Sequence, residues 1–481
     1  MTSTTLTPLT SNQTSDPTPI QRTFSAQLDT SIRLRQSTTA ERLTKIKKLK
    51  QAVLAHSEDI IAAGFADFGK PATEVELTEI LPIVAEANDA IRKLSGWMKP
   101  KKVWPSRMMF GTFGYTQYEP KGRVLIISPW NYPVNLTLGP LVSAIAAGNT
   151  VIIKTSEMTP HLSTVIGTII RETFDETEIA LFEGDATVAQ ALLELPFDHI
   201  FFTGSPAVGK VVMTAAAKNL TSVTLELGGK SPTIIDESAD LELAAKNTLW
   251  AKFTNNGQTC IAPDHVYVHA SVKDAFIKHC VDALDSIYGK DAQKIESPDL
   301  ARIVNTRHVA RVKGLLDDAT SRGARVITGG QYDESKRFIA PTLLDDIPDN
   351  AEIMREEIFG PLLPIISFTQ LDNVIARINA DPKPLALYVW SRNKENIKKV
   401  MQQTTSGGAC INHSVVQFLH GNLPFGGVNN SGIGSGHGHF GFMAFSHERG
   451  VVRSWIILAK MFYPPYTSFT RKLIAIFIKT V

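Results

Sequence analysis

The chain has 481 residues, too many for a single hydrophobic core, and a usual domain length of ~100–200 residues predicts about two to four domains. The basic residues exceed the acidic ones by only two, 49 against 47, so the overall charge does not favour nucleic acid as a partner. The three cysteines, Cys260, Cys280 and Cys410, are too few and odd in number for a disulfide framework, and they indicate a reducing compartment.

The first 20 residues predict a flexible leader, because ten of them are Ser or Thr and three more are Pro. This segment has no basic region followed by an apolar run, so we expect no signal peptide. No stretch of ~18 apolar residues occurs anywhere in the chain, so no membrane-spanning helix is expected. These observations together predict a cytoplasmic protein.

A mostly helical region is predicted from near Phe24 to about Leu94. Thr38 and Glu41 stand three residues apart, as in a capping box at a helix start. Apolar residues then follow at helical spacing: Leu43, Ile46, Leu49 and Val53. The segment from Gly96 to Pro105 is typical of a break between elements.

The middle of the chain alternates between strand and helix patterns. Val124–Ser128 and Val151–Lys154 are short apolar runs typical of buried strands. The apolar segment from Pro133 to Ala147 lies between them and ends at Gly148, a common helix stop. Such a βαβ unit predicts a parallel sheet covered on both faces. Further strands are expected at His199–Thr203, Val223–Leu227, Val266–Val268, Pro364–Phe368 and Ala386–Trp390.

Asn131 follows the first strand of this unit, within the segment SPWNYP. Open α/β sheets bind ligands at the carboxyl ends of their strands, so an amide here could stabilise a developing oxyanion. Taken alone, an asparagine before Tyr-Pro is more typical of a turn residue.

The loop GSPAVG, residues 204–209, also lies between a predicted strand and a predicted helix. Its glycines could let a helix N-terminus approach a phosphate. Residues 204–211 differ from a P-loop at one position, because Val211 stands where a Ser or Thr would hold magnesium. The loop also lacks the G-x-G-x-x-G pattern of dinucleotide-binding folds. Phosphate contact and an ordinary strand-to-helix turn are both compatible with it.

Glu226 and Cys260 are the candidate reactive residues. Glu226 lies in an apolar strand before two glycines, where burial would raise its pKa and suit it to act as a general base; a salt-bridged carboxylate is the alternative. Cys260 ends the polar segment NNGQTC, where backbone amides or a cationic partner could increase its thiolate fraction. A lone cysteine is, however, most often a small buried hydrophobic residue.

The C-terminal tail differs in composition from the rest of the chain. From Val452 onward it contains five basic residues, no acidic ones and several interleaved aromatics. This mixture suits an anionic membrane surface, although the apolar run Leu473–Ile478 is far too short to span one. Docking against a second subunit, or folding over the substrate entrance, is the favoured alternative.

In chain order, the motifs resemble those of the aldehyde dehydrogenase superfamily. The matching segments are SPWNYP (128–133), GNTVIIKTSE (148–157), FFTGSPAVG (201–209), LELGGKSP (225–232), GQTC (257–260), EEIFGP (356–361) and LPFGG (423–427). The segment WMKPKKV (97–103) and the C-terminal GSGHG, FSH and YPPYT are similar to the class 3 and fatty aldehyde dehydrogenase branch. The resemblance extends from about residue 25 to about residue 470.

The resemblance implies an α/β fold with a Rossmann-like cofactor-binding domain, an α/β catalytic domain and a small bridging element for oligomerisation. On this basis residues 1–20 form the leader and residues 21–227 the NAD(P)-binding domain, with a bridging hairpin near 105–122. Residues 228–415 form the catalytic domain. Residues 416–481 return to the cofactor domain and then supply a bridging segment and the tail. A homodimer is expected.

The resemblance also implies how an aldehyde is oxidised to a carboxylic acid. Cys260 would form a thiohemiacetal and then a thioester, and Glu226 would activate the water that hydrolyses it. Asn131 and the Cys260 amide would hold the oxyanion. The substrate would be a medium- or long-chain aliphatic aldehyde or an aromatic one, and no metal is implied.

The implied cofactor is NAD, with NADP as an alternative, because a Glu157 carboxylate at the ribose would repel a 2′-phosphate. Lys154 and Glu157 would bind the adenosine ribose, and Glu357 the nicotinamide ribose. The remaining residues assigned to the cofactor are Trp130, Gly204, Ser205 and Gly209, with Phe359 packed against the nicotinamide. The chain departs from the family pattern at Thr155, where Pro is usual, and at Asn429, where Gly is common.

Three other functions would account for part of this sequence pattern. A CoA-acylating dehydrogenase would share Cys260 but typically lacks a carboxylate at the position of Glu226. A P-loop nucleotide hydrolase is disfavoured by Val211. A non-catalytic structural relative is disfavoured because Cys260, Glu226 and Asn131 are all present.

Overall fold

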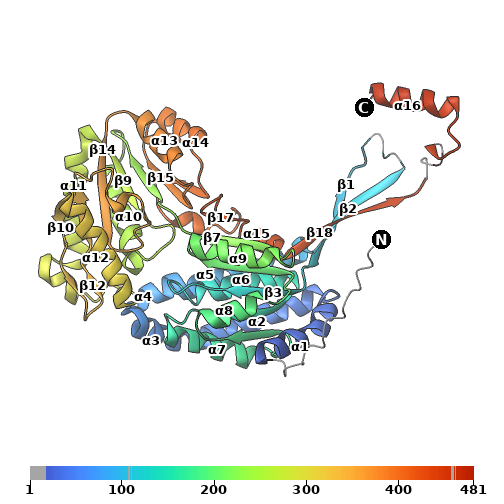
Figure 1. Ribbon diagram of the computed structural model, residues 1–481, viewed down its shortest axis with the longest axis horizontal. Coiled ribbons are helices and arrows are strands. Elements are labelled where there is room, and N and C mark those ends of the chain that lie inside the picture. The colour runs from blue at the N-terminus through green and yellow to red at the C-terminus, as the bar shows by residue number, and fades with distance from the viewer. Residues whose placement is uncertain (1–17, 107–108, 110, 457–459, 461, 481) are drawn as a thin grey trace, which may run out of the picture.

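The structure is a computed structural model, and it describes residues 18–106, 109, 111–456, 460 and 462–480. Most of the expected leader over residues 1–20 therefore lies outside the described residues. The first helix begins at Pro19, within that range, and a capping box formed by Thr18 and Gln21 starts it. Figure 1 shows two α/β bodies side by side, and a long β-arm projects from one of them.

The helical N-terminal region contains α1 Pro19–Leu34, α2 Thr39–Ala55, α3 Ser57–Phe68, the short α4 Ala72–Val75, a π-helical turn Glu76–Ile80 and α5 Leu81–Trp97. The predicted capping box at α2 is present: Thr38 Oγ1 accepts from the Glu41 N–H, and the Glu41 carboxylate accepts from the Thr38 N–H. A short strand, β1 Lys101–Val103, lies inside the segment expected to be a break.

The first body is built on a six-stranded sheet of order β17-β7-β6-β3-β4-β5, parallel except for β17. Its strands are β3 Arg123–Ile127, β4 Thr150–Lys154, β5 Ile179–Phe182, β6 His199–Gly204, β7 Ser222–Leu227 and β17 Gly432–Ile433. The helices that follow its strands are α6 Asn135–Ala147, α7 Pro160–Thr173, α8 Ala186–Leu193 and α9 Pro206–Ala217. The last strand matters for the site, because Gly432 pairs with Glu226 although the two are far apart in sequence.

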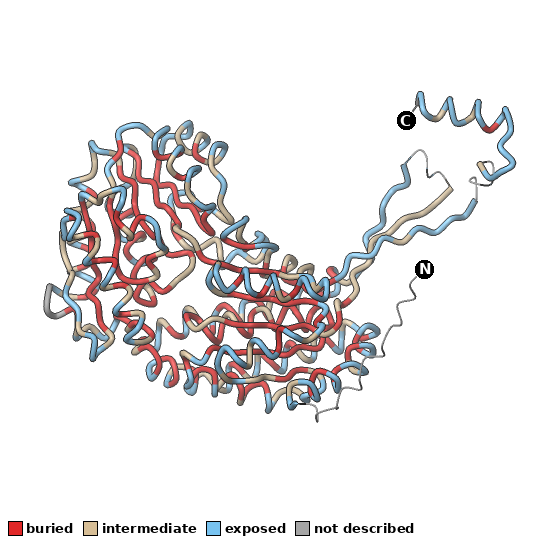
Figure 2. The backbone as a smooth tube through the Cα atoms, viewed as in Figure 1, coloured by how far each residue is buried: buried red, intermediate tan, exposed pale blue. Residues whose placement is uncertain are grey.

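Alternate residues of this sheet pack into two separate cores, as the period of a buried strand requires. Ile126 and Ile153 face the core formed with α2, α3, α5, α6 and α7, whereas Leu125 and Ile152 face the core formed with α1, α8 and α9. Figure 2 shows the strands of both bodies as buried and the outer helix faces as exposed.

The second body has a seven-stranded sheet of order β10-β13-β14-β9-β8-β15-β16, in which only the edge strand β10 is antiparallel. Its strands are β8 Pro232–Ile235, β9 His265–His269, β10 Arg325–Thr328, β13 Thr342–Asp345, β14 Leu362–Phe368, β15 Ala386–Trp390 and β16 Gly408–Ile411. Its longer helices are α10 Leu241–Phe253, α11 Lys273–Tyr288, α12 Thr306–Ser321, α13 Leu371–Ala380 and α14 Lys394–Gln403. Beside them lie the small hairpin β11 Tyr332–Asp333 and β12 Phe338–Ile339, and the 3₁₀ turns Thr254–Gly257, Ala270–Val272, Asp291–Glu296, Glu352–Met354 and Val416–Leu419.

The arm is a three-stranded antiparallel sheet of β1, β2 Thr112–Pro120 and β18 Ser446–Ser454. β18 follows α15 Gly438–Ala444 and pairs with β2 along its whole length, from Ser446 opposite Pro120 to Ser454 opposite Thr112. Beyond its tip lies α16 Ser468–Thr480, which contains the predicted apolar run (Figure 1). In the part of the chain that the structure describes, no helix is both long and apolar enough to cross a bilayer.

Candidate active site

The candidate residues converge at the carboxyl ends of the strands of the first sheet. Asn131 follows β3, Ser205 follows β6, and Glu226 lies near the end of β7. Cys260 comes from the second body, just after the 3₁₀ turn Thr254–Gly257. One cavity of about 210 Å³ is lined by eight of the predicted site residues: Trp130, Asn131, Gly204, Ser205, Glu226, Cys260, Glu357 and Phe359.

The other three predicted residues lie outside this cavity. Lys154 is buried at the end of β4, and its Nζ forms an ion pair of 3.1 Å with the exposed Glu157 carboxylate. Gly209 is buried in the first turns of α9, where a Cβ would lie 2.7 Å from Leu227 Cδ2. The glycine therefore lets α9 pack closely on β7, a role in packing that the motif did not predict.

Cys260 is partly exposed and lines three cavities, one towards Glu357, one towards Glu226 and Glu86, and one bounded mostly by apolar side chains. Burial, followed by the Glu357 and Glu226 carboxylates, raises the pKa of its thiol to about 12, although nearby backbone N–H groups oppose the shift. The backbone amides predicted from NNGQTC are thus present, but their effect on the pKa is smaller than that of burial and the two carboxylates. The thiol of the free protein is therefore protonated at neutral pH.

Glu226 is buried, and neither of its carboxylate oxygens accepts a hydrogen bond from a described side chain, although the Gly436 backbone N–H lies close to it. Burial raises its pKa well above the ordinary value. The alternative interpretation of Glu226, a salt-bridged carboxylate, is wrong, because no ion pair of Glu226 occurs among the described residues. An isolated buried carboxyl beside a thiol is the arrangement expected of a group that exchanges protons with water or substrate.

Asn131 is held at both its backbone and its side chain. Its Nδ2 donates to the Gln258 carbonyl at 3.0 Å, and its own carbonyl accepts from Asn255 Nδ2 at 2.7 Å and from Lys70 Nζ at 3.1 Å. A primary amide has two N–H donors, so one remains for a ligand in the cavity. These contacts tie the loop after β3 to the loop that carries Cys260.

The buried pair Lys70–Glu79 supports this arrangement, although no sequence motif marks either residue. Their Nζ and Oε1 atoms are 3.4 Å apart, and the side chains are 0% and 1% exposed. The other Glu79 oxygen accepts from the N–H groups of Val134 and Asn135, at 3.1 and 2.9 Å, at the start of α6. Removing one member of such a pair leaves the other as an uncompensated buried charge.

Replacing Lys70 with methionine is therefore expected to destabilise the protein by about 3–5 kcal/mol, since Glu79 would remain buried and unpaired. The midpoint of urea unfolding measures the effect. Lys246→Met is the matched control, because it breaks an exposed ion pair with Glu242 and should cost less than about 1 kcal/mol. Equal midpoints for the two variants would contradict the expectation.

Two residues of α12 also line the cavity although no motif marks them. The His308 ring lies 5.0 Å from the Trp130 ring, and Arg311 donates to the carbonyls of Glu357 and Ile358. The Arg311 side chain thus holds the backbone of the loop EEIFGP in place. Glu357 itself packs on the peptide of Gly228, where any side chain would collide with the carboxylate. Burial, with Asp264 nearby, raises the pKa of Glu357 to about 8.

The cavity has features suited to a dinucleotide. It begins at Gly204 and Ser205, where α9 presents its N-terminus and Ser205 caps it, and such a terminus favours phosphate. It is also lined by the Trp130 and Phe359 rings, which contact each other edge to face at a centroid distance of 5.3 Å, and by Cys260. Phosphate contact at one end and a nucleophile at the other are thus compatible with one extended cofactor.

The chain is similar to known proteins over nearly all of its length. A model of the aldehyde dehydrogenase family matches residues 3–451. A putative aldehyde dehydrogenase of Bacillus subtilis, AldX, is 49% identical over 90% of this chain and 97% of its own. The 4,4'-diaponeurosporen-aldehyde dehydrogenase of Staphylococcus aureus is 44% identical over 88% of this chain and 92% of its own. The dimeric NADP-preferring aldehyde dehydrogenase of the rat is 41% identical, over 88% and 93%.

Solved structures agree with these sequence relatives. The substrate-bound AldH of Staphylococcus aureus superimposes with a TM-score of 0.91 at 41% identity, and the alignment covers 96% of this chain and all of that one. A lactaldehyde dehydrogenase of Escherichia coli superimposes with a TM-score of 0.81 at 27% identity, over 90% of this chain and 91% of that one.

Proposed function

Since this chain belongs to the aldehyde dehydrogenase family, we propose that it oxidises an aldehyde to a carboxylic acid through a covalent adduct on Cys260. The observation that carries the proposal is the convergence of Cys260, Glu226 and Asn131, from three separate segments, on one cavity. The decisive test is the Cys260→Ala variant, which should lose oxidation and keep cofactor binding.

In the first step, the Cys260 thiol loses its proton to water, its sulfur attacks the aldehyde carbon, and the carbonyl oxygen becomes an oxyanion. The free N–H of Asn131 Nδ2 and the Cys260 backbone N–H donate to it, which supplies roughly 100- to 1000-fold in rate per donor. When bound, the oxidised nicotinamide supplies the hydride acceptor and a positive charge that favours the thiolate. The thiohemiacetal carbon loses its hydride and becomes a thioester.

In the second step, Glu226 takes a proton from the water that attacks the thioester. The sulfur–carbon bond breaks, the departing sulfur takes the second proton of the attacking water, and the product leaves as a carboxylate with Cys260 again in its thiol form. The raised pKa of Glu226 suits this role, because a general base is most effective when its pKa lies near the working pH. Glu226 also distinguishes this reaction from CoA-dependent acylation, and an assay with and without CoA tests that alternative.

The family uses NAD(P), and we propose that the two bodies bind different parts of this cofactor. The six-stranded body, within residues 21–227 and the return from 416, supplies Trp130, Gly204 and Ser205. The seven-stranded body, within residues 228–415, supplies Cys260, Glu357 and Phe359, the last two for the nicotinamide ribose and ring. Lys154 and Glu157 lie further along the same sheet edge, where we propose that they bind the adenosine ribose.

Glu157 is proposed to disfavour NADP, because its carboxylate would face the 2′-phosphate. Glu157→Gln is then expected to lower the KM for NADP by about tenfold, worth ~1.4 kcal/mol, with little change in kcat. Initial rates with both cofactors measure it. Glu194→Gln is the matched control, because this exposed carboxylate pairs with Lys218, away from the end of β4. An unchanged NADP-to-NAD ratio of kcat/KM would refute the role of Glu157, and the NADP-preferring rat relative makes that comparison necessary.

The proposed substrate is a medium- or long-chain aliphatic aldehyde, or an aromatic one. Support comes from a cavity of about 120 Å³ beside Cys260 that is bounded mainly by apolar side chains. Among them are Leu77, Leu136, Trp250, Ile261, Val416, Phe418 and Phe425. Such walls stabilise an alkyl chain or an aromatic ring and give a charged tail no partner.

We further propose a homodimer, with the tail docked against the second subunit or over the substrate entrance. The exposed apolar side chains of α16 support a docking role: Phe469, Ile474, Ile476 and Ile478. Peripheral membrane contact is the competing proposal, because Arg471, Lys472 and Lys479 lie on the same helix. Truncation after Tyr466, followed by pelleting with anionic vesicles and a chain-length profile, separates the two.

A further inference from the structure

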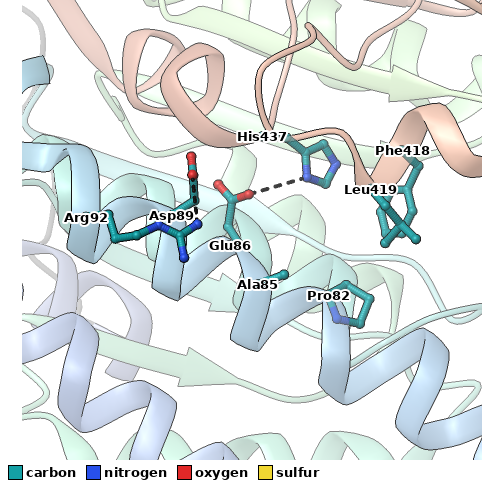
Figure 3. A pocket seen from close by; sticks show the side chains of 9 residues that line it. Pro82, Ala85, Glu86, Asp89, Arg92, Phe418, Leu419 and His437 are labelled. Carbon is teal, nitrogen blue, oxygen red and sulfur yellow. Dashed lines mark hydrogen bonds and ion pairs between the residues drawn. The ribbon is translucent and has the colours of Figure 1, made fainter.

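Two cavities share a wall next to the proposed base. The inner one, of about 40 Å³, is lined by Glu226, Cys260, Glu86 and His437, among others. The outer one, of about 140 Å³, is lined by the same Glu86 and His437, together with Asp89 and Arg92 of α5 (Figure 3). The inner cavity has room for at least one water molecule. Glu86 and His437 therefore stand between Glu226 and the outer cavity.

His437 has an unusual backbone conformation. It lies between β17 and α15 with φ 66° and ψ 139°, a region that side chains other than glycine rarely adopt. Residues held in such conformations cluster at functional sites. The ring is bounded by the Phe418 and Phe425 rings, at centroid distances of 5.2 and 5.1 Å, both nearly perpendicular to it. The strained backbone thus places an imidazole in a defined position between the two cavities.

Glu86 is fixed opposite this imidazole. One of its oxygens accepts from the Gly438 N–H at 2.7 Å and from Ser143 Oγ at 3.4 Å. The other oxygen lies 3.8 Å from His437 Nδ1 (Figure 3). The carboxylate and the imidazole therefore face each other at the wall that the two cavities share. Asp89 and Arg92 face the outer cavity, and Asp89 forms ion pairs with both Arg92, at 3.3 Å, and Lys93, at 2.6 Å.

The proposed reaction requires a proton exit. Oxidation of RCHO by NAD⁺ and water yields RCOO⁻, NADH and two protons, and hydrolysis delivers one of them to Glu226. Glu226 is buried and forms no hydrogen bond with a described side chain, so it cannot pass the proton directly to a neighbouring side chain. The other two cavities at Cys260 are those assigned to the cofactor and the substrate. The inner cavity is then the route left open during hydrolysis.

We infer that His437, paired with Glu86, accepts the proton of Glu226 through water in the inner cavity and releases it to the outer cavity. The O–H bond of the Glu226 carboxyl breaks as a water oxygen takes the proton, and that water gives one of its own protons to an imidazole nitrogen. The imidazolium then loses a proton to solvent in the outer cavity. No electrons are exchanged, and each group returns to its starting form. This inference rests on the proposed role of Glu226.

His437→Gly provides a clean test, because glycine adopts the observed backbone conformation without strain and leaves a space for free imidazole. With hexanal and NAD⁺, the burst of reduced cofactor should keep its wild-type amplitude. Decay of the acyl-enzyme, followed by quenched-flow mass spectrometry, should slow by about 10- to 100-fold, the lower part of the range for a positioned proton acceptor. Added imidazole should restore the decay rate in proportion to its concentration.

His439→Gln is the matched control, since its ring packs on Trp97 and Phe442 and lines neither cavity. Glu86→Gln should slow the decay in the same direction as His437→Gly, without rescue by imidazole. Acyl-enzyme decay at the wild-type rate in His437→Gly, or slow decay insensitive to imidazole, overturns the inference. If instead no adduct forms on Cys260 in the wild-type protein, the proposed function itself fails.

Discussion

Alanine in place of Cys260 is expected to abolish aldehyde oxidation, by about 10⁴-fold or more, while NAD⁺ still binds. The methyl group of alanine cannot form the thiohemiacetal, so no carbon is positioned to lose its hydride. The cofactor cavity is otherwise lined by residues that the substitution does not touch, such as Trp130, Ser205 and Phe359. Formation of reduced cofactor measures the first effect, and titration calorimetry with NAD⁺ measures the second.

Cys280→Ala is the matched control for this experiment. Its thiol is fully buried in the core between α10, α11 and the second sheet, and burial alone raises its pKa. This variant should lose some stability and retain activity. Undiminished dehydrogenase turnover by Cys260→Ala would remove the basis of the assignment, whereas loss of both activity and NAD⁺ binding would indicate a general disturbance of the site.

Seven strands of the two bodies were predictable because they are buried and therefore appear as apolar runs, namely β3, β4, β6, β7, β9, β14 and β15, whereas β5, β8, β10, β13 and β16 were not predicted. Ala386–Trp390 has the predicted bounds, β3 is shifted from the prediction by one residue at both ends, and β4 begins one residue earlier. β17 was not predictable: it is only two residues long, and it exists because Gly432 pairs with Glu226 across the chain. β1 was not predictable for a similar reason: its three residues are exposed, and they form a strand only because they pair with β2.

The residues of the candidate site also include some that could be predicted from the sequence and some that could not. Residues within contiguous motifs, such as Asn131, Glu226 and Cys260, could be selected from the sequence because their neighbours form recognisable turns and strands. Lys70 and His437 could not, because each acquires its role from a contact with a distant segment: Lys70 with the Asn131 carbonyl, and His437 with Glu86. Their residue types alone predict neither contact.

Replacing Glu226 with glutamine is expected to separate the two chemical steps. The amide has the same shape but cannot accept the proton of the hydrolytic water, so hydrolysis should slow by about 100- to 10,000-fold. The thioester would still form, because the thiolate, the oxyanion donors and the hydride acceptor remain. A burst of reduced cofactor, stoichiometric with the subunits, should therefore precede a slow steady state in stopped-flow absorbance.

Glu194→Gln is the matched control, because Glu194 is exposed at the end of α8 and forms a surface ion pair with Lys218. It should show the wild-type progress curve. If Glu226→Gln lost the burst together with the turnover, Glu226 would instead be needed to deprotonate the thiol. The pKa of Cys260, raised to about 12 in the free protein, makes that outcome physically reasonable, and the burst amplitude decides between the two roles.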